Sequence, residues 1–164
     1  MIMKYIIADI NNIDEIILLL KEVIERLNSI KLPLWNDEYP SLELMKKDLI
    51  SGGGRIIIQG NHIIAYAHIG DSIEEFGENV FIHDNLYSIS RLMVRSGYEN
   101  QGVATYLIKK IEEEVKSLNR PGLGIMVHPI NKKAIKLYEK LGFVFENKKE
   151  YEYGEYSTYS YLFK

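Results

Sequence analysis

The chain has 164 residues, 46% of them hydrophobic and 26% charged, which is typical of one soluble globular domain, residues 1–164, with its own core. Its formal net charge of −3 speaks against nucleic acid as a partner, and the absence of cysteine excludes disulfides, cysteine nucleophiles and thiolate-bound metals. No apolar run is long enough to span a bilayer and Met1–Ile10 lacks the apolar core of a signal peptide, so we expect a cytoplasmic protein with no membrane partner.

Hydrophobic periodicity and turn residues predict the elements along the chain. Ser41 and Asn131 are candidate helix N-caps, and Gly60-Asn61 is a dipeptide typical of a tight hairpin turn. The predicted elements are a strand over 3–8, helices over 12–29 and 41–50, strands over 55–59 and 63–69, a polar irregular segment over 71–84, a strand over 86–95, a helix over 102–118, a strand over 123–128, a helix over 131–141, and strands over 143–150 and 156–163.

The segment from Ser90 to Thr105 is the most informative part of the chain. Leu92, Met93 and Val94 predict the end of a buried strand, and Gly102-Val103-Ala104 opens a helix after a short polar turn. A helix that begins directly after a strand and a tight loop leaves several backbone N–H groups unpaired, and its dipole adds partial positive charge there. The pattern predicts a cradle for phosphate or pyrophosphate. Close packing of the helix on the strand is the alternative reason for these small residues.

A second motif follows, Asn131-x-x-Ala134-x-x-Leu137-Tyr138-x-x-Leu141-Gly142-Phe143. Together with Leu92-x-Val94 and Glu99-x-x-Gly102-x-Ala104, it resembles the GCN5-related N-acetyltransferase (GNAT) family. The predicted order, β-α-α-β-β-β-α-β-α-β-β, matches that fold over essentially the whole chain. The resemblance implies an α/β (α+β) fold with a mixed, mostly antiparallel central sheet flanked by helices. It also implies a splayed strand pair, which we expect between residues 90–95 and 123–128.

The family resemblance implies a cosubstrate, acetyl-coenzyme A, and a reaction, transfer of its acetyl group to a primary amine by direct attack in a ternary complex. The pyrophosphate would lie on the N–H groups of residues 100–105, and the pantetheine arm would run beside the preceding strand as a pseudo-strand. The cofactor-binding candidates are therefore Leu92, Met93, Val94, Asn100, Gln101, Gly102, Val103, Ala104, Thr105 and Asn131.

Tyr138 is the candidate catalytic residue. A phenol, with an ordinary pKa of about 10, stays protonated at neutral pH and can donate a hydrogen bond, or a proton as general acid, to the departing thiolate. The backbone N–H of Val94 is the candidate donor that polarises the thioester carbonyl. Tyr138 has a simpler alternative role, as an aromatic side chain that packs against its neighbours. Asn131, one of the cofactor-binding candidates, has one too: we expect it to act first as a helix N-cap and second as a cofactor contact.

Three positions depart from the family pattern. Glu99 stands where Gln or Arg is usual, and Asn100 replaces a common glycine. Met126 stands where some peptide N-acetyltransferases carry a glutamate, so the proton acceptor is unassigned. The candidates for that acceptor are water, Glu74, Glu75, His83, Asp84 and His128.

The acceptor is expected to be a small-molecule or peptide amine, and the acidic side chains of the chain favour a cationic small molecule. Trp35 and Tyr39 are candidates for lining its site, with core packing as the alternative. We expect no metal, because no His/Asp/Glu spacing indicates one. The tyrosine-rich segment from Tyr151 to Tyr161 could stack in a homodimer interface or simply complete the sheet.

Two functions from other classes stay open at this point. A non-catalytic acyl-coenzyme A sensor would keep the cofactor cradle and regulate a partner. An unrelated nucleotide-binding domain would use the same loop for ATP or NAD. The sequence also leaves open whether the donor carries an acetyl or a longer acyl group.

Overall fold

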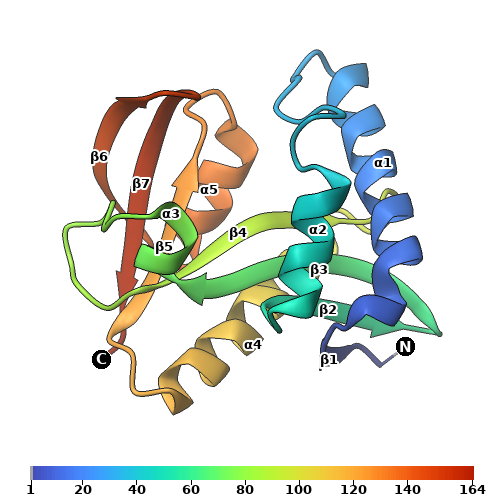
Figure 1. The fold of residues 1–164 in the computed structure, drawn as a ribbon, viewed down its shortest axis with the longest axis horizontal. Coiled ribbons are helices and arrows are strands. Elements are labelled where there is room, and N and C mark those ends of the chain that lie inside the picture. Colours follow the sequence, from blue (N-terminus) through green and yellow to red (C-terminus); the bar gives the residue numbers. More distant parts are fainter. Residues whose placement is uncertain (1) are drawn as a thin grey trace. The chain divides into compact units, whose positions relative to one another are not determined.

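The computed structural model of the protein describes residues 2–164, whose helices and strands are shown in Figure 1. In chain order the elements are β1 (Lys4–Ile7), the 3₁₀ helix η1 (Ile10–Asn12), α1 (Ile13–Ser29), α2 (Leu42–Ile50), β2 (Gly54–Gln59), β3 (His62–Asp71), α3 (Ser72–Phe76), β4 (Tyr87–Val94), α4 (Val103–Ser117), β5 (Gly122–Val127), α5 (Lys132–Lys140), β6 (Val144–Tyr151) and β7 (Gly154–Leu162).

The strands form a mixed, mostly antiparallel sheet of seven strands in the order β1-β2-β3-β4-β5-β7-β6, flanked by helices. The pairs β1–β2, β2–β3, β5–β7 and β6–β7 are antiparallel, whereas β4 and β5 are parallel. The fold class and the predicted element order are confirmed, with η1 and α3 as additions.

The helix α3 corrects the prediction of an irregular segment over 71–84. The Asp71 carboxylate accepts hydrogen bonds from the N–H groups of Ile73 and Glu74, at 2.9 and 3.2 Å, and so caps the helix. Gly77, at φ 77°, ends it after five residues. A helix this short carries no hydrophobic period, so only its cap could have predicted it.

Local signals fixed several boundaries as predicted. Ser41 Oγ accepts the N–H of Leu44 at 3.1 Å, which confirms it as the N-cap of α2. Gly60 and Asn61 have φ values of 57° and 66°, the left-handed pair that a two-residue hairpin turn requires.

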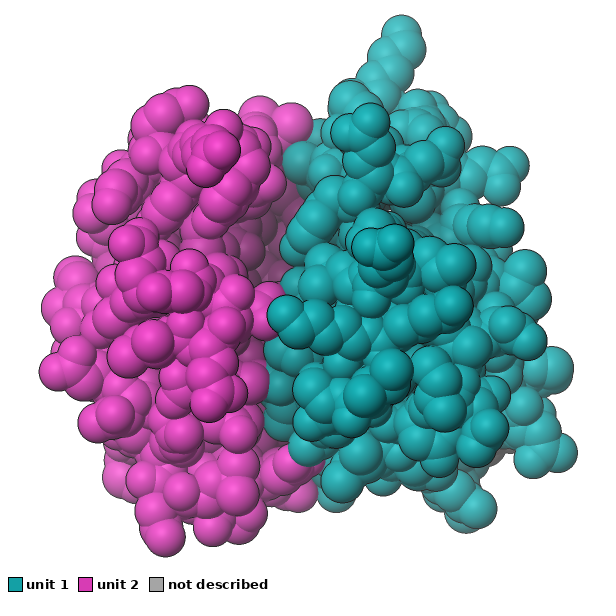
Figure 2. Space-filling model, viewed as in Figure 1, with its two compact units in different colours: residues 1–69, 91–110 teal, residues 70–90, 111–164 magenta. Residues whose placement is uncertain are grey.

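The chain forms two compact units, which Figure 2 distinguishes by colour. Unit 1 comprises residues 1–69 and 91–110, and unit 2 comprises residues 70–90 and 111–164. The chain passes from one unit to the other three times, inside β3, inside β4 and inside α4.

Unit 1 is built on the apolar stripe of α1, where Ile16, Leu19, Leu20 and Val23 are buried at helical spacing. These side chains join one cluster with residues of α2, β2, β3 and β4. Burying such a stripe is the main stabilisation of an amphipathic helix. The remaining members of the cluster are Ala8, Met45, Leu49, Ile56, Ile63, Tyr66 and Met93.

Unit 1 also contains a buried ion pair that the sequence did not predict. Arg91 binds Asp48 in bidentate fashion, with both N···O distances at 2.7 Å, and each side chain is 3% exposed. The phenol of Tyr66 donates to the same carboxylate at 2.9 Å. Because these groups satisfy one another, the charges are tolerated in the interior.

Unit 2 contains the ladders of β5 with β7 and of β7 with β6. Gly124 of β5 lies under the ring of Phe81, since a Cβ at Gly124 would stand 2.4 Å from the Phe81 Cζ atom. No helix within residues 2–164 has the length and apolar character needed to cross a membrane.

Candidate functional site

The connection from β4 to α4 begins with a tight turn. The N–H of Tyr98 donates to the Arg95 carbonyl at 3.0 Å, and Gly97 occupies the third position of the turn at φ 92°. A positive φ there is typical of a type II turn and favours glycine. The Gln101 side chain donates to the Gly97 carbonyl at 2.9 Å and closes the loop on itself.

The start of α4 has the form that a phosphate cradle requires. The first helical hydrogen bond runs from the Tyr106 N–H to the Gly102 carbonyl at 2.9 Å, so the N–H groups of Val103, Ala104 and Thr105 precede the ladder. Gly102 has φ 78°, and a Cβ built there would meet no atom within 4 Å. Helix–strand packing therefore does not explain this glycine; its backbone conformation and an open face do.

Asn100 also adopts the left-handed conformation, at φ 60°. Asn is the residue that tolerates this region best after glycine. Asn100 therefore adopts a left-handed backbone conformation that the glycine common in the family would also allow. Asn100 and Gln101 are exposed, so the residues directly before Gly102 lie at the surface.

Glu99 turns away from the start of α4. Its Oε2 atom accepts the Gly97 N–H at 2.6 Å, and its Oε1 atom lies 3.1 Å from Nη1 of Arg26 in α1. Sequence reasoning missed Arg26 because it stands far from Glu99 in the chain and its helix position carries no motif. This arginine supplies the positive charge that pairs with the Glu99 carboxylate.

The three predicted residues at the end of β4 lie in unit 1. Met93 is buried, and Leu92 and Val94 are half-buried. The Arg95 N–H donates to the Ile64 carbonyl of β3 at 2.8 Å, so the N–H of Val94 points to the opposite edge of the strand. The Val94 carbonyl accepts from Arg26 Nη2 at 2.9 Å.

Unit 2 holds the first half of β4 and its parallel partner. The two strands pair over Tyr87–Leu123, Ser88–Gly124 and Ile89–Ile125. Strand β5 continues to Val127 in its ladder with β7. The parallel ladder therefore comprises three residue pairs and ends at Ile89 of β4.

Unit 2 also holds Tyr138 and Asn131, both on α5 or at its start. Tyr138 is 7% exposed, and this burial raises its pKa to about 12. Its ring lies 5.9 Å from that of Phe143, centroid to centroid. Asn131 Oδ1 accepts the Ala134 N–H at 3.3 Å, which confirms the predicted N-cap.

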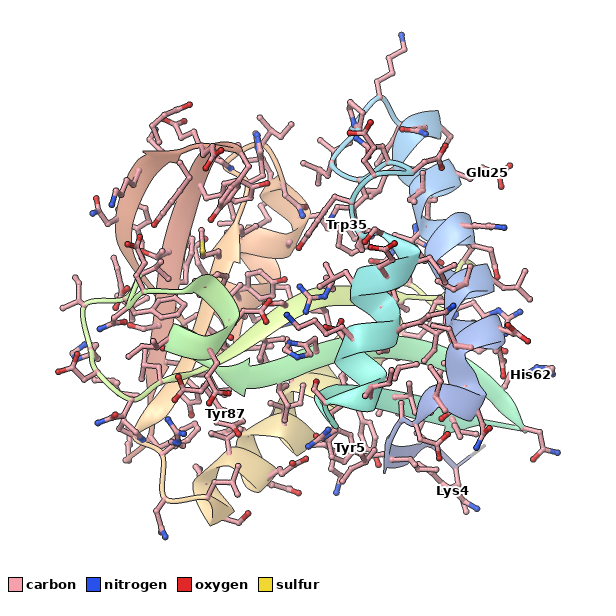
Figure 3. All side chains as sticks on the ribbon, in the orientation of Figure 1. Lys4, Tyr5, Glu25, Trp35, His62 and Tyr87 are labelled. Atoms are coloured by element: carbon pink, nitrogen blue, oxygen red, sulfur yellow. The ribbon has the colours of Figure 1, made fainter. Side chains whose placement is uncertain are left out.

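The two acceptor-site candidates, Trp35 and Tyr39, differ in their surroundings. Trp35 follows α1 and packs against the buried cluster of unit 1 (Figure 3). Tyr39 is 46% exposed. Trp35 therefore contributes to the core, while Tyr39 presents its ring to solvent.

The side chains that are candidates for the proton acceptor all lie in unit 2. Glu74, His83 and Asp84 are exposed, and Asp84 accepts from the Asn79 amide at 2.9 Å. His128 Nδ1 accepts the Ile130 N–H at 3.2 Å, which occupies that nitrogen's lone pair. None of residues 2–164 forms a group of three or more acidic or histidine side chains that could hold a metal ion.

Comparison with known proteins gives one consistent family. The model of the acetyltransferase (GNAT) family matches residues 20–143, well over half of the chain. No curated protein sequence matches the chain significantly.

Solved structures share the fold at low sequence identity. A GNAT-family acetyltransferase from Streptococcus agalactiae is 22% identical with a TM-score of 0.84, and the match covers 99% of this chain and 96% of that one. A GNAT-family acetyltransferase from Listeria monocytogenes is 16% identical at TM-score 0.79, covering 98% and 95%. The PaiA N-acetyltransferase of Thermoplasma acidophilum, in complex with coenzyme A, is 16% identical at TM-score 0.76, covering 98% and 100%.

Proposed function

The chain belongs to the GNAT acetyltransferase family, and from this we propose that it is an N-acetyltransferase that moves the acetyl group of acetyl-coenzyme A to a primary amine. One observation carries the proposal: the first backbone N–H groups of α4 precede its hydrogen-bond ladder beside a glycine whose Cβ position is empty. Such a helix start binds anions through its donors and its dipole.

The cofactor would be held mainly by main chain. Its pyrophosphate would accept hydrogen bonds from the N–H groups around Gly102–Thr105, with Asn100 and Gln101 shaping the turn before them. The pantetheine amides would pair with the outward edge of β4 at Leu92, Met93 and Val94, as an added strand does. Asn131, besides capping α5, would contact the cofactor through its amide nitrogen. The complex of a family member with coenzyme A supports this role for the fold.

In the proposed reaction the amine nitrogen attacks the thioester carbonyl carbon directly, in a ternary complex. The Val94 N–H would stabilise the negative charge on the carbonyl oxygen. The carbon–sulfur bond then breaks, sulfur leaves with the bonding electrons as a thiolate, and the surplus proton of the amine passes to water.

Tyr138 would act on the leaving sulfur as a hydrogen-bond donor. Its pKa of about 12 exceeds that of a thiol, about 8.5, so full proton transfer to the thiolate is uphill by about 5 kcal/mol. A hydrogen bond from a phenol that stays protonated stabilises the thiolate without that cost. Of the two roles that the sequence allows for Tyr138, general acid and hydrogen-bond donor, we propose the second.

The acceptor is proposed to be a small-molecule or peptide amine. Exposed carboxylates on and after α3, Glu74 and Asp84 among them, favour a cationic amine by charge. Exposed Tyr39 is the better candidate for acceptor contact, since Trp35 packs in the core.

The aromatic rings at the β6–β7 turn, with Tyr151 stacked on Tyr153 at 5.5 Å between ring centroids, offer a surface for a homodimer. The protein would act in the cytoplasm.

A two-step experiment tests the proposal. Thermal unfolding is measured with acetyl-coenzyme A, longer acyl-coenzyme A donors, ATP and NAD, and free thiol is then followed across a panel of amines. Stabilisation by acetyl-coenzyme A and amine-dependent thiol release support an acetyltransferase. Stabilisation without thiol release from any amine favours the acyl-coenzyme A sensor, and stabilisation by ATP or NAD alone would refute both.

A further inference from the structure

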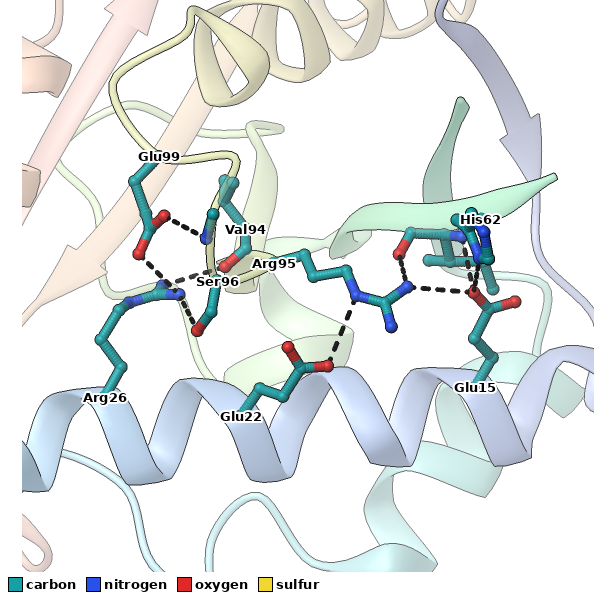
Figure 4. A network of polar contacts seen from close by, with 10 residues as sticks. Glu15, Glu22, Arg26, His62, Val94, Arg95, Ser96 and Glu99 are labelled. Carbon is teal, nitrogen blue, oxygen red and sulfur yellow. Dashed lines mark hydrogen bonds and ion pairs between the residues drawn. The ribbon is translucent and has the colours of Figure 1, made fainter. Parts of the chain in front are cut away.

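One side chain of α1, Arg26, binds the end of β4 and two residues of the connection that follows it (Figure 4). Arg26 Nη2 donates to the Val94 carbonyl and Nη1 to Ser96 Oγ, both at 2.9 Å. The same Nη1 lies 3.1 Å from Glu99 Oε1. Arg26 thus binds the strand end, the turn and the residue that stands where the family usually has Gln or Arg.

Glu99 is the unusual member of this group. Its carboxylate accepts a backbone N–H of the loop, that of Gly97, at 2.6 Å. Only Asn100 and Gln101 separate it from Gly102, where the proposed pyrophosphate cradle begins. A carboxylate that binds one loop amide is chemically able to bind the next ones, and its charge repels a diphosphate at short range.

We propose that Arg26 is a positioning residue that keeps the Glu99 carboxylate away from the start of α4, and so leaves the amides there free for the diphosphate. The inference rests on the proposed function. The ion pair directs the carboxylate toward α1, and the Gly97 N–H fixes its second oxygen. In effect, Arg26 and Glu99 together replace the single polar residue that the family commonly has at this position.

A purely structural role for Arg26 predicts something different. Its bonds to Val94 and Ser96 would tie α1 to the strand end whatever residue stood at 99. Losing Arg26 would then damage the loop equally with Glu99 or with Gln at that position. The two roles are separated by asking whether neutralising Glu99 rescues the loss of Arg26.

The experiment measures the dissociation constant of acetyl-coenzyme A, together with KM and kcat, for Arg26→Met, Glu99→Gln and the double variant. We expect Arg26→Met to weaken acetyl-coenzyme A binding about tenfold, or about 1.4 kcal/mol, with KM rising and kcat nearly unchanged. Glu99→Gln keeps an acceptor for the Gly97 N–H without the charge, so it should bind like the unaltered protein. The double variant should recover to within about threefold of it.

Arg95→Met is the matched control. Arg95 also joins this connection to α1, through Glu15 and Glu22 at 3.4 Å each, and its side chain is 26% exposed, as is that of Arg26 (Figure 4). In Figure 4 the Arg95 side chain extends away from Glu99, toward Glu22 and Glu15, so its loss should change thermal stability but not acetyl-coenzyme A affinity.

Two results would overturn the inference. Binding by Arg26→Met at the unaltered affinity, or an equal loss in the double variant, would leave Arg26 with at most a structural role. If the unaltered protein itself does not bind acetyl-coenzyme A, the proposed function fails and this inference falls with it. Normal binding by the unaltered protein combined with an unrescued loss overturns this inference alone.

Discussion

Replacing Gly102 by alanine tests the cradle at its most constrained point. The φ of 78° is a left-handed conformation, which costs a residue with a Cβ about 1–2 kcal/mol. No protein atom lies within 4 Å of the new methyl group, so no clash adds to that cost. For a chain of this size the midpoint of thermal unfolding should fall by about 2–8 °C.

The effect on the cofactor should be larger than the effect on the fold. A methyl group that meets no protein atom would instead meet a diphosphate seated on the neighbouring amides. Loss of one charge-assisted hydrogen bond, about 1.5–3 kcal/mol, weakens acetyl-coenzyme A binding roughly 10- to 150-fold. Isothermal titration calorimetry with the purified variant measures this directly.

Gly77→Ala supplies the control, because it imposes the same strain outside the proposed cradle. Gly77 has φ 77° at the end of α3, and its Cβ position is equally empty. Both variants should lose similar thermal stability, while only Gly102→Ala loses affinity. Equal acetyl-coenzyme A affinity in the two variants would show that the start of α4 does not seat the diphosphate.

Three further perturbations have defined outcomes. Tyr138→Phe should lower kcat about 10- to 100-fold, with little change in the KM for acetyl-coenzyme A. Because the raised pKa of Tyr138, about 12, keeps its phenol protonated below that pH, kcat of the unaltered protein should not fall between about pH 8 and 10 through ionisation of Tyr138. A fall in kcat over this range that Tyr138→Phe abolishes would contradict this prediction. Asp48→Asn removes the carboxylate that buried Arg91 binds and should destabilise the protein by about 3–5 kcal/mol in urea unfolding. Adding Arg91→Met to this variant should restore part of the loss, and a cost near zero for Asp48→Asn would contradict a buried ion pair. Burial raises the pKa of Asp71, but hydrogen bonds from Arg120 and the α3 amides outweigh this and hold the pKa below its usual 3.8. The Asp71 carboxylate therefore stabilises the protein above that pH, and this stabilisation is lost as the pH falls further. The stability of Asp71→Asn should then depend less on pH below about 4 than that of the unaltered protein, and an equal dependence would refute the prediction.

The sequence by itself predicted what neighbouring residues determine. Ser41 and Asn131 cap their helices through an N–H three residues away, and Gly60-Asn61 turns the hairpin through its own backbone angles. The strand–loop–helix around Gly102 is likewise a local pattern. Such features lie within a few residues of chain, where the identity of each residue limits its backbone conformation directly.

The tertiary structure alone decided which distant charges meet. Arg26 and Glu99, and likewise Asp48 and Arg91, are paired only after α1 and α2 have packed and the strands have taken their register. Side-chain spacing along the chain contains no information about such contacts, because the sheet register places one strand end beside one helix position among many. For the same reason the sequence marked Glu99 as a departure from the family pattern, whereas only the packed helix α1 supplied the arginine that accommodates it.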